Sequence, residues 1–393
     1  MYFYVDHTSR FGRNTGIQRC VRAIASALIG LGVPLRPVVW SRESSGLAAP
    51  SPMALKHLAL WSGPAPQAWA PVEASPAHPT DGWLLVVELV SGPHQPTPEQ
   101  LHAAAARLGA RVVWVFHDAI PLRWAHLYGA RAAITAACHR TYMHGLASAG
   151  LVLANSRTSA QDLRAVLAER SLPEQHVLAL PLAHEFPGVA RAQPMPADPL
   201  VSRPQRLLCV GSLEPRKNHV GLLKAVAILS AQDAFAAELV LVGWPNDSRV
   251  VACVQRALSL RLPLRWEADA DDAGLLDLYR WADLTVVPSL EEGFGLPVAE
   301  SLWHGRPCVC SGEGALGELA AAGGCLALQD TGWRTIAQAL RRWLEDPALR
   351  KRLRAEVAQR PLRTWASYAH ELLATLADHP MRSSLSQAST PLS

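Results

Sequence analysis

The residues best suited to chemistry are two glutamates separated by a glycine-containing turn, in the string PSLEEGFGLPVAE that ends at Glu300. Glu292 lies in the turn, and Glu300 follows Pro297, a residue that helices accept in their first turn. Backbone N–H groups at a helix start bind anions, and glycine lets a phosphate approach the chain closely. Carboxylates beside such a site can accept hydrogen bonds from sugar hydroxyls. The string therefore predicts a site for a phosphate-bearing sugar, although an acidic turn before a helix-capping glutamate has the same bare spacing.

A pair of cations stands in a similar position in VGSLEPRKN. Gly211 follows a short apolar run, Arg216 and Lys217 lie in the loop, and Asn218 is placed to cap the next helix. A guanidinium and an ammonium group together can neutralise a diphosphate as negative charge develops on it. A solvated surface pair is the alternative. The position at the carboxyl end of a strand, where open α/β sheets bind ligands, favours the site.

Two weaker candidates lie in the first half of the chain. His117 and Asp118 end the apolar run VVWVF, where the imidazole can hydrogen-bond a sugar hydroxyl and Asp118 either orients it or caps the next turn. Gly16 lies in the loop RFGRNTGIQR, where it would let the chain approach a phosphate at a helix start. Arginines add positive charge to the same loop: Arg10, Arg13 and Arg19.

These candidates require strands that end at the site and helices that begin there. In the first half, strands are predicted at 2–5, 83–89, 111–116, 151–156 and 176–182, and helices at 17–32, 98–108, 127–148 and 159–169. In the second half, strands are predicted at 206–212, 238–243, 262–266, 284–289 and 307–311, and helices at 219–231, 248–260, 273–280 and 296–304. Such alternation predicts parallel sheets covered by crossover helices. We therefore expect an α/β protein with two facing Rossmann-like domains and a central cleft.

The domain boundaries follow from composition. The chain has 393 residues, enough for two domains of about 100–200 residues each. We expect an N-terminal domain at 1–190, a Pro- and Ala-rich linker at 191–205, a C-terminal domain at 206–362 and a polar, disordered tail at 379–393. Residues 42–82 show weak periodicity, so a long irregular excursion is predicted there.

Composition also excludes several classes of protein. The formal net charge of +4 is too mild to indicate a nucleic-acid partner. The first ten residues do not have the pattern of a secretory signal, and no run of 18 apolar residues occurs, so a cytoplasmic protein is expected. No metal site is expected, because Asp269–Asp271 falls in a stretch typical of a solvated loop. The basic segment 339–357 has two interpretations: a solvated amphipathic helix, which we favour, or a peripheral membrane contact.

Together these strings resemble the family-four retaining glycosyltransferases, which have the two-domain GT-B fold. The resemblance rests on VGSLEPRKN, on LYRWADLTVVPSLEEGFGLPVAESLWHGRPCVCS, on VFHDAIPL and on TGIQR, and it covers most of the chain. TGIQR and HDAIPL are similar to bacterial mannosyl- and rhamnosyltransferases of surface polysaccharides. The resemblance implies a metal-independent hexosyltransferase without a cofactor. Its substrates would be a nucleotide sugar, GDP-mannose, and a saccharide or lipid-linked acceptor.

The resemblance also implies a role for each residue that matches a family motif. Arg216 and Lys217 would bind the donor diphosphate and act as catalytic groups, Glu300 would bind the ribose, and Glu292 would contact the donor sugar. The remaining contacts would come from the amides of Phe294, Gly295 and Leu296, from Gly16 and Gly211 near the phosphates, and from His117 beside the transferred sugar. A last helix at 363–378 would pack back on the N-terminal domain through Trp365.

One departure from the family pattern and two rival functions stay open. Where the family often has proline before an acidic residue, this chain has Gly317 before Glu318, and Gly314 and Gly317 predict a looser loop there. The same fold and residues would suit a nucleotide-sugar epimerase or phosphorylase. A non-catalytic subunit that binds sugar nucleotides is the other alternative.

Overall fold

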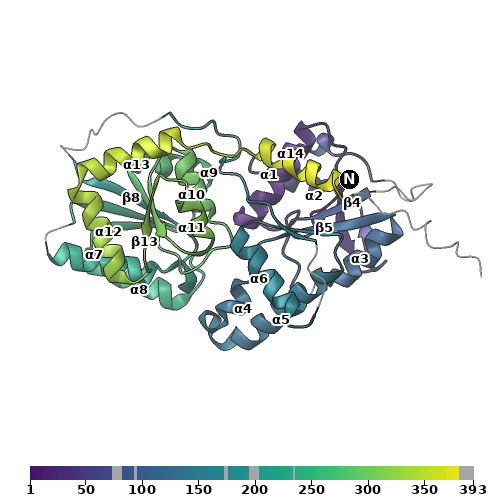
Figure 1. Ribbon diagram of the computed structural model, residues 1–393, viewed down its shortest axis with the longest axis horizontal. Coiled ribbons are helices and arrows are strands. Elements are labelled where there is room, and N and C mark those ends of the chain that lie inside the picture. Colours follow the sequence, from purple (N-terminus) through teal and green to yellow (C-terminus); the bar gives the residue numbers. More distant parts are fainter. Residues whose placement is uncertain (73–81, 93–94, 172–175, 194–202, 233–234, 380–393) are drawn as a thin grey trace, which may run out of the picture.

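The computed structural model describes residues 1–72, 82–92, 95–171, 176–193, 203–232 and 235–379, which form two α/β halves side by side (Figure 1). The N-terminal half is built on a seven-stranded sheet in the order β3-β2-β1-β4-β5-β6-β7. Its neighbouring strands are parallel except β2 and β3, which form an antiparallel hairpin. The strands are β1 (Tyr2–Tyr4), β2 (Arg36–Ser41), β3 (Gly46–Ala48), β4 (Gly82–Val86), β5 (Ala110–Phe116), β6 (Leu151–Ala154) and β7 (Val177–Ala179).

Helices cover both faces of this sheet, and their ends are set by local sequence. The side chain of Ser156 accepts a hydrogen bond from Ser159 N at the start of α6, and Thr97 forms a capping box with Gln100 at the start of α3. The helices are α1 (Gly16–Gly30), α2 (Pro52–Leu58), η1 (Pro66–Ala68), α3 (Pro98–Arg107), α4 (Ile120–Arg123), η2 (Ala125–Arg131), α5 (Ala132–Gly145), η3 (Leu146–Ser148) and α6 (Arg157–Ala168).

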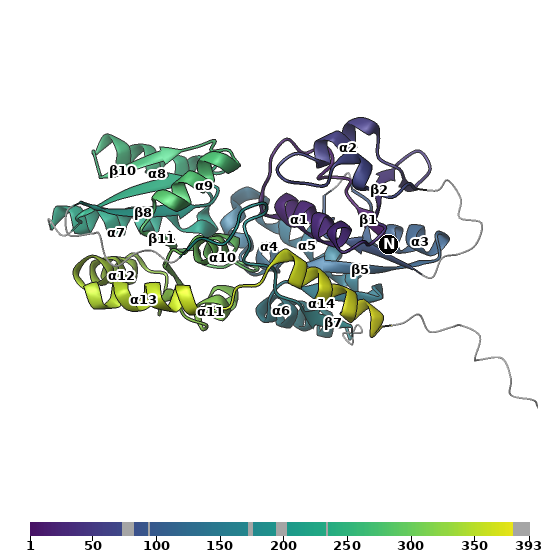
Figure 2. The same cartoon turned by 90° about the horizontal axis from the view of Figure 1, so that it is seen from above.

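The C-terminal half is a six-stranded parallel sheet in the order β10-β9-β8-β11-β12-β13, again with helices on both faces (Figure 2). Its strands are β8 (Gln205–Val210), β9 (Ala237–Val242), β10 (Leu264–Glu267), β11 (Leu284–Val287), β12 (Cys308–Ser311) and β13 (Cys325–Leu328). Its helices are η4 (Pro215–Lys217), α7 (His219–Ala231), α8 (Ser248–Ser259), α9 (Asp272–Trp281), α10 (Leu296–Trp303), α11 (Gly314–Ala320), α12 (Trp333–Glu345) and α13 (Pro347–Gln359).

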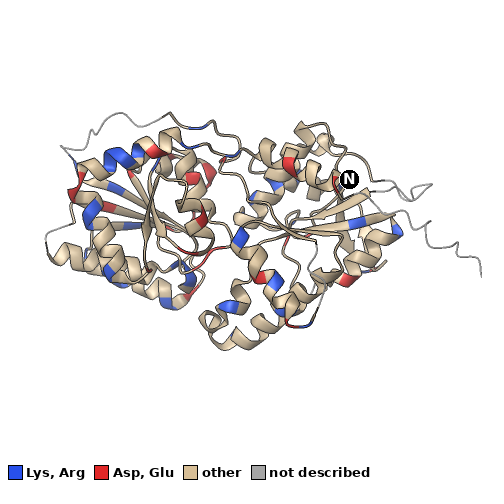
Figure 3. Cartoon of the chain, in the orientation of Figure 1, with Lys and Arg blue, Asp and Glu red and all other residues tan. Residues whose placement is uncertain are grey.

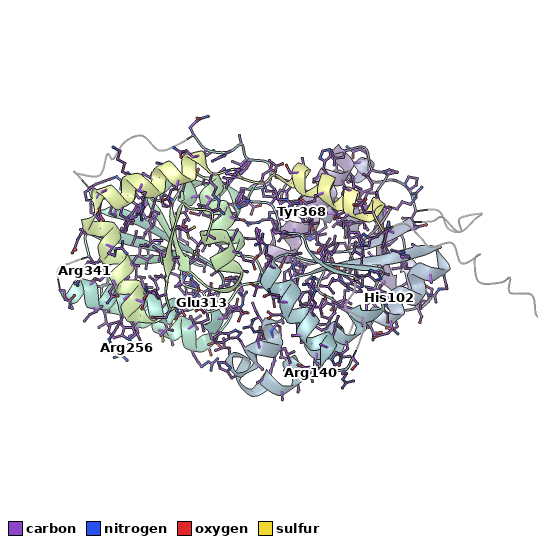
Figure 4. All side chains as sticks on the ribbon, viewed as in Figure 1. His102, Arg140, Arg256, Glu313, Arg341 and Tyr368 are labelled. Carbon is purple, nitrogen blue, oxygen red and sulfur yellow. The ribbon has the colours of Figure 1, made fainter. Side chains whose placement is uncertain are left out.

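The described chain passes between the halves near His184 and again near Arg363, and the two passages are hydrogen-bonded to each other. His184 N donates to Arg363 O at 2.9 Å, and the indole of Trp365 donates to Glu185 O at 3.0 Å. After the second passage, α14 (Trp365–Ala377) packs along α1 of the N-terminal half, and its residue Tyr368 lies over that half (Figure 4). Most of the predicted linker, residues 194–202, and the tail, residues 380–393, lie outside the described residues.

Two predictions about secondary structure were wrong. The stretch 42–82, expected to be irregular, contains β3 and α2. The signal for α2 was present, since Ser51 caps the helix and Pro52 occupies its first turn. The basic stretch 339–357 is two helices rather than one, because Asp346 caps α13 and Pro347 begins it. Within the described residues, no helix is both long enough and apolar enough to cross a membrane.

Candidate active site between the two halves

A cavity of about 680 Å³ lies between the halves, at the carboxyl ends of strands from both sheets. Basic and acidic segments meet at this junction (Figure 3). The cavity wall contains every residue that the sequence singled out for donor binding or catalysis: Gly16, His117, Gly211, Arg216, Lys217, Glu292, Phe294, Gly295, Leu296 and Glu300. The fold therefore brings together residues that lie far apart in the chain.

Glu292 is the centre of the ionic part of this site. Lys217 Nζ lies 2.6 Å from Glu292 Oε1, and Arg216 Nη1 lies 2.8 Å from Oε2. Ser289 Oγ donates to Oε1 at 2.7 Å. Burial opposes the charge on Glu292, but the two cations outweigh it and lower the pKa of the carboxyl to about 2. One carboxylate thus holds both cations at the edge of the cavity.

The loop that carries the cations is fixed by Asn218. This residue has left-handed backbone angles, with φ of 55°, and its Oδ1 accepts a hydrogen bond from Gly221 N at 3.2 Å, so it caps α7 as predicted. Its Nδ2 donates to Pro288 O at 3.1 Å. Because Pro288 follows strand β11, this bond ties the cation loop to the glutamate turn and sets the spacing of Lys217 and Glu292.

Helix α10 begins at the cavity wall. Gly295 precedes its first residue with φ of 104°, a conformation that favours glycine. A Cβ added at Gly295 would lie 2.5 Å from a side-chain carbon of Leu316, so space also requires glycine there. The N–H groups of a first helical turn have no acceptor within the helix. An anion in the cavity would find these donors and the positive end of the helix dipole.

His117 follows the last residue of strand β5 and is buried in the cavity wall. Its Nε2 lies 2.6 Å from Val87 O. A carbonyl oxygen only accepts, so Nε2 carries the hydrogen and Nδ1 of the neutral ring is an acceptor. Burial lowers the pKa of His117, which favours this neutral form. Asp118 does not orient the imidazole: its Oδ1 accepts from Ile120 N at 2.9 Å and so caps the following turn.

The region around Gly317 differs from the expectation of a loose loop. Gly317 lies inside helix α11, where a Cβ would stand 2.3 Å from Gly312 O. The neighbouring Glu318 faces the N-terminal half, where its carboxylate accepts from Thr158 N at 2.7 Å and Arg157 N at 3.0 Å. The acidic residue therefore caps α6 of the opposite half, a role that the sequence prediction missed.

Sequence reasoning also missed part of the cavity wall. Residues 268–272, expected to form a solvated loop, line the cavity together with Trp244 and Asn14. A usable signal was present, because three carboxylates follow the end of strand β10. No group of three or more His, Cys, Asp or Glu side chains in the described part of the chain is arranged to hold a metal ion.

Comparisons with known proteins agree with this geometry. Residues 195–360 match the family described as Glycosyl transferases group 1. O-antigen chain mannosyltransferase B of Escherichia coli is 34% identical over 149 residues, which are 34% of this chain and 39% of that protein. D-inositol 3-phosphate glycosyltransferase of Rhodococcus opacus (strain B4) is 37% identical over 161 residues, 39% of this chain and 35% of that protein. The chain thus spans little more than a third of the length of these curated relatives.

Solved structures with the same architecture extend the similarity over both halves. The structure of HepE from Anabaena in complex with UDP-glucose has a TM-score of 0.64 at 16% identity, and the match covers 96% of this chain and 99% of that one. WaaG, a glycosyltransferase involved in lipopolysaccharide biosynthesis, has a TM-score of 0.62 at 16% identity, with 95% and 98% covered. These matches confirm the predicted fold. Residues 195–360 therefore match the glycosyl transferases of group 1, and the two halves of the chain together have the GT-B fold.

Proposed function

We propose that this protein is a retaining glycosyltransferase that moves a hexose from a nucleotide sugar to a saccharide or lipid-linked acceptor. The observation that carries the proposal is the cavity between the halves. It combines a lysine and an arginine, a buried carboxylate and the start of a helix within one volume of about 680 Å³. A nucleoside diphosphate sugar presents the matching chemistry, with two phosphates for the cations and the helix and hydroxyls for the carboxylates.

In the proposed reaction the acceptor hydroxyl attacks the anomeric carbon from the side on which the diphosphate leaves. The bond from the sugar to the diphosphate breaks, the new glycosidic bond forms, and a leaving phosphate oxygen takes the hydroxyl proton. Arg216 and Lys217 stabilise the charge that develops on the diphosphate. Glu292 accepts a hydrogen bond from a sugar hydroxyl, and His117 packs beside the sugar, so that the donor is fixed for attack. No metal and no protein base is required in this scheme.

We propose that the donor is GDP-mannose, and that mannose is the sugar transferred, in the synthesis of a bacterial polysaccharide. The similarity to an O-antigen chain mannosyltransferase supports the sugar and the setting. HepE was solved with UDP-glucose, but that protein resembles this one in fold, at 16% sequence identity. We also propose that the protein acts in the cytoplasm.

A second cavity, of about 760 Å³, is a candidate binding site for the acceptor. It lies in the N-terminal half and shares Thr15 and Ile17 with the donor cavity, so ligands in the two would meet there. Its wall mixes aromatic, planar polar and charged side chains, which suits hydroxyl-rich sugar rings: His7, Arg10, Phe11, Gln18, Arg42, Glu88 and Gln95. We propose that the acceptor saccharide binds in this second cavity.

The experiment that tests the function follows transfer of mannose from GDP-mannose to a panel of lipid-linked and free saccharides, with the anomeric configuration of the product determined by NMR. Transfer with retained configuration supports the proposal. Conversion of the donor to another sugar nucleotide without an acceptor would indicate an epimerase. Nucleotide binding without turnover on any acceptor would indicate a non-catalytic subunit.

A further inference from the structure

Arg19 reaches from one half of the protein into the donor cavity wall of the other. It lies in the first turns of α1, and its Nη1 donates to Oε1 of Glu300 on α10, a residue 281 positions away in the chain. Its Nη2 lies 3.5 Å from Oδ1 of Asp272 at the start of α9. The side chains of Arg19 and Glu300 are 13% and 3% exposed, so this ion pair is almost shielded from water.

Glu300 is held by one group from each half. Tyr279, on the same half as Glu300, donates its hydroxyl to Oε2 at 2.9 Å, and Arg19 from the opposite half holds Oε1. An ionised carboxylate has about four acceptor positions. The two that remain match two neighbouring hydroxyls such as the 2′- and 3′-hydroxyls of a ribose. The contacts of Arg19 and Tyr279 therefore orient Glu300 without filling it.

Neighbouring residues of the same loop reinforce this contact along the cavity wall. Asn14 Nδ2 donates to Asp272 Oδ2 at 3.1 Å, and Arg22 in turn donates to Asn14 Oδ1 at 3.1 Å. The guanidinium of Arg13 lies 3.5 Å from the ring centroid of Trp244. The loop that begins α1 is thus fastened to the C-terminal half at several points, of which Arg19 is the most buried.

Electrostatics make the bridge depend on closure of the two halves. Burial opposes the charge on Arg19, but Glu300 and Asp272 outweigh it and raise the pKa of the guanidinium. If the halves moved apart, Arg19 would lose both carboxylates and Glu300 would lose its cation. The closed arrangement is therefore the one in which Arg19 and Tyr279 together orient Glu300.

We infer that Arg19 is a positioning residue, which holds Glu300 in the orientation that receives the ribose and so couples nucleotide binding to closure of the two halves. The inference rests on the proposed function, because it takes a nucleoside diphosphate as the ligand of the cavity. It adds a residue of the N-terminal half to a ribose site that otherwise belongs to the C-terminal half.

The test compares GDP with 2′,3′-dideoxy-GDP, measured by titration calorimetry on the wild type and on Arg19→Met. We expect the substitution to lower the affinity for GDP by roughly 10-fold or more, which is the scale of a hydrogen bond to a charged group. It should change the affinity for the dideoxy nucleotide little, because that ligand has no ribose hydroxyls for Glu300. An equal loss on both nucleotides, or no loss on GDP, would overturn the inference.

Two further variants separate positioning from closure. Tyr279→Phe removes the contact to Glu300 from within the same half, so it should weaken the binding of GDP. In small-angle X-ray scattering, the GDP-bound variant should be as compact as the GDP-bound wild type. Arg19→Met should weaken the binding of GDP and should leave the GDP-bound protein less compact than the GDP-bound wild type. If both variants were equally compact with GDP bound, Arg19 would not couple binding to closure.

Controls keep a structural defect distinct from the proposed effect. Arg140→Met removes the same charge from a surface pair with Glu169 in the N-terminal half, away from the junction (Figure 4), and should bind both nucleotides like the wild type. If Arg19→Met fails to fold, Arg19→Lys keeps the charge with a shorter reach and should show a smaller loss confined to GDP. Failure of the wild type to bind GDP and the other nucleoside diphosphates would overturn the proposed function, and the inference with it.

Discussion

A Cβ atom added at Gly293 would stand 2.2 Å from the carbonyl oxygen of His117, so the backbones of the two halves touch where the glutamate turn meets the end of strand β5. Gly293→Ala should therefore keep the halves from closing fully. A displacement of about 1 Å at a site of this kind can reduce turnover by roughly 100-fold. We expect a loss of that order in kcat, with circular dichroism unchanged.

The control for this substitution is Gly30→Ala. Gly30 lies at the end of α1, and a Cβ there meets nothing within 4 Å. Turnover by Gly30→Ala should equal that of the wild type. Equal activity of both alanine variants would show that the contact between Gly293 and His117 does not matter for closure.

Lys217→Met should lower kcat by about 100- to 1,000-fold, because one donor to the developing negative charge is lost from a partly water-excluded site. Initial rates at saturating donor measure this directly. Lys224→Met provides the matched control, since Lys224 lies on the exposed face of the following helix α7. Undiminished kcat in Lys217→Met would mean that the diphosphate leaves without this cation.

The ion pairs of Glu292 predict a pH-dependent contribution to stability. The pKa of this carboxyl in the folded protein, about 2, lies below its ordinary value of 4.5. The folded state thus favours the charged form, and the stabilisation is fully present above pH 4.5 and is lost as the pH falls towards 2. The difference in free energy of unfolding between the wild type and Glu292→Gln should shrink from pH 7 to pH 3. Urea unfolding at a series of pH values measures it, and a constant difference would contradict the assignment.

Ser91→Trp tests the second cavity as the acceptor site. Ser91 lines that cavity but not the donor cavity, so a bulky side chain there should obstruct the acceptor alone. We expect a large rise in the acceptor KM with an unchanged dissociation constant for the nucleotide. An unchanged acceptor KM would place the acceptor elsewhere.

Much of the fold could be predicted because each element carries its own local signal. Helix α7 has an apolar run and an Asn218 cap, and its observed bounds of His219–Ala231 are those predicted. The hairpin of β2 and β3 was not predicted, because its strands are short and β2 contains Pro37, which weakens a strand pattern. Helix α2 was missed although Ser51 and Pro52 mark its start.

Contacts between the halves could not be predicted from local patterns. Arg19 and Glu300 are separated by 281 residues, and nothing in either string indicates the other. Glu318 caps a helix of the opposite half, and this contact follows only from the relative placement of the two sheets. Motifs therefore identified part of the cavity wall, whereas the pairing of Glu292 with Lys217 and the role of the α1 loop required the structure.

The most direct test of the central claim, that the cavity between the halves binds a nucleoside diphosphate sugar, is thermal unfolding with GDP, UDP, ADP and dTDP, each with and without its sugar. A ligand at 100 times its dissociation constant stabilises the folded state by about 2.7 kcal/mol, which is readily seen as a higher melting temperature. We predict a selective rise with GDP and GDP-mannose that is lost in Lys217→Met. The absence of any rise with all of these ligands would contradict the account.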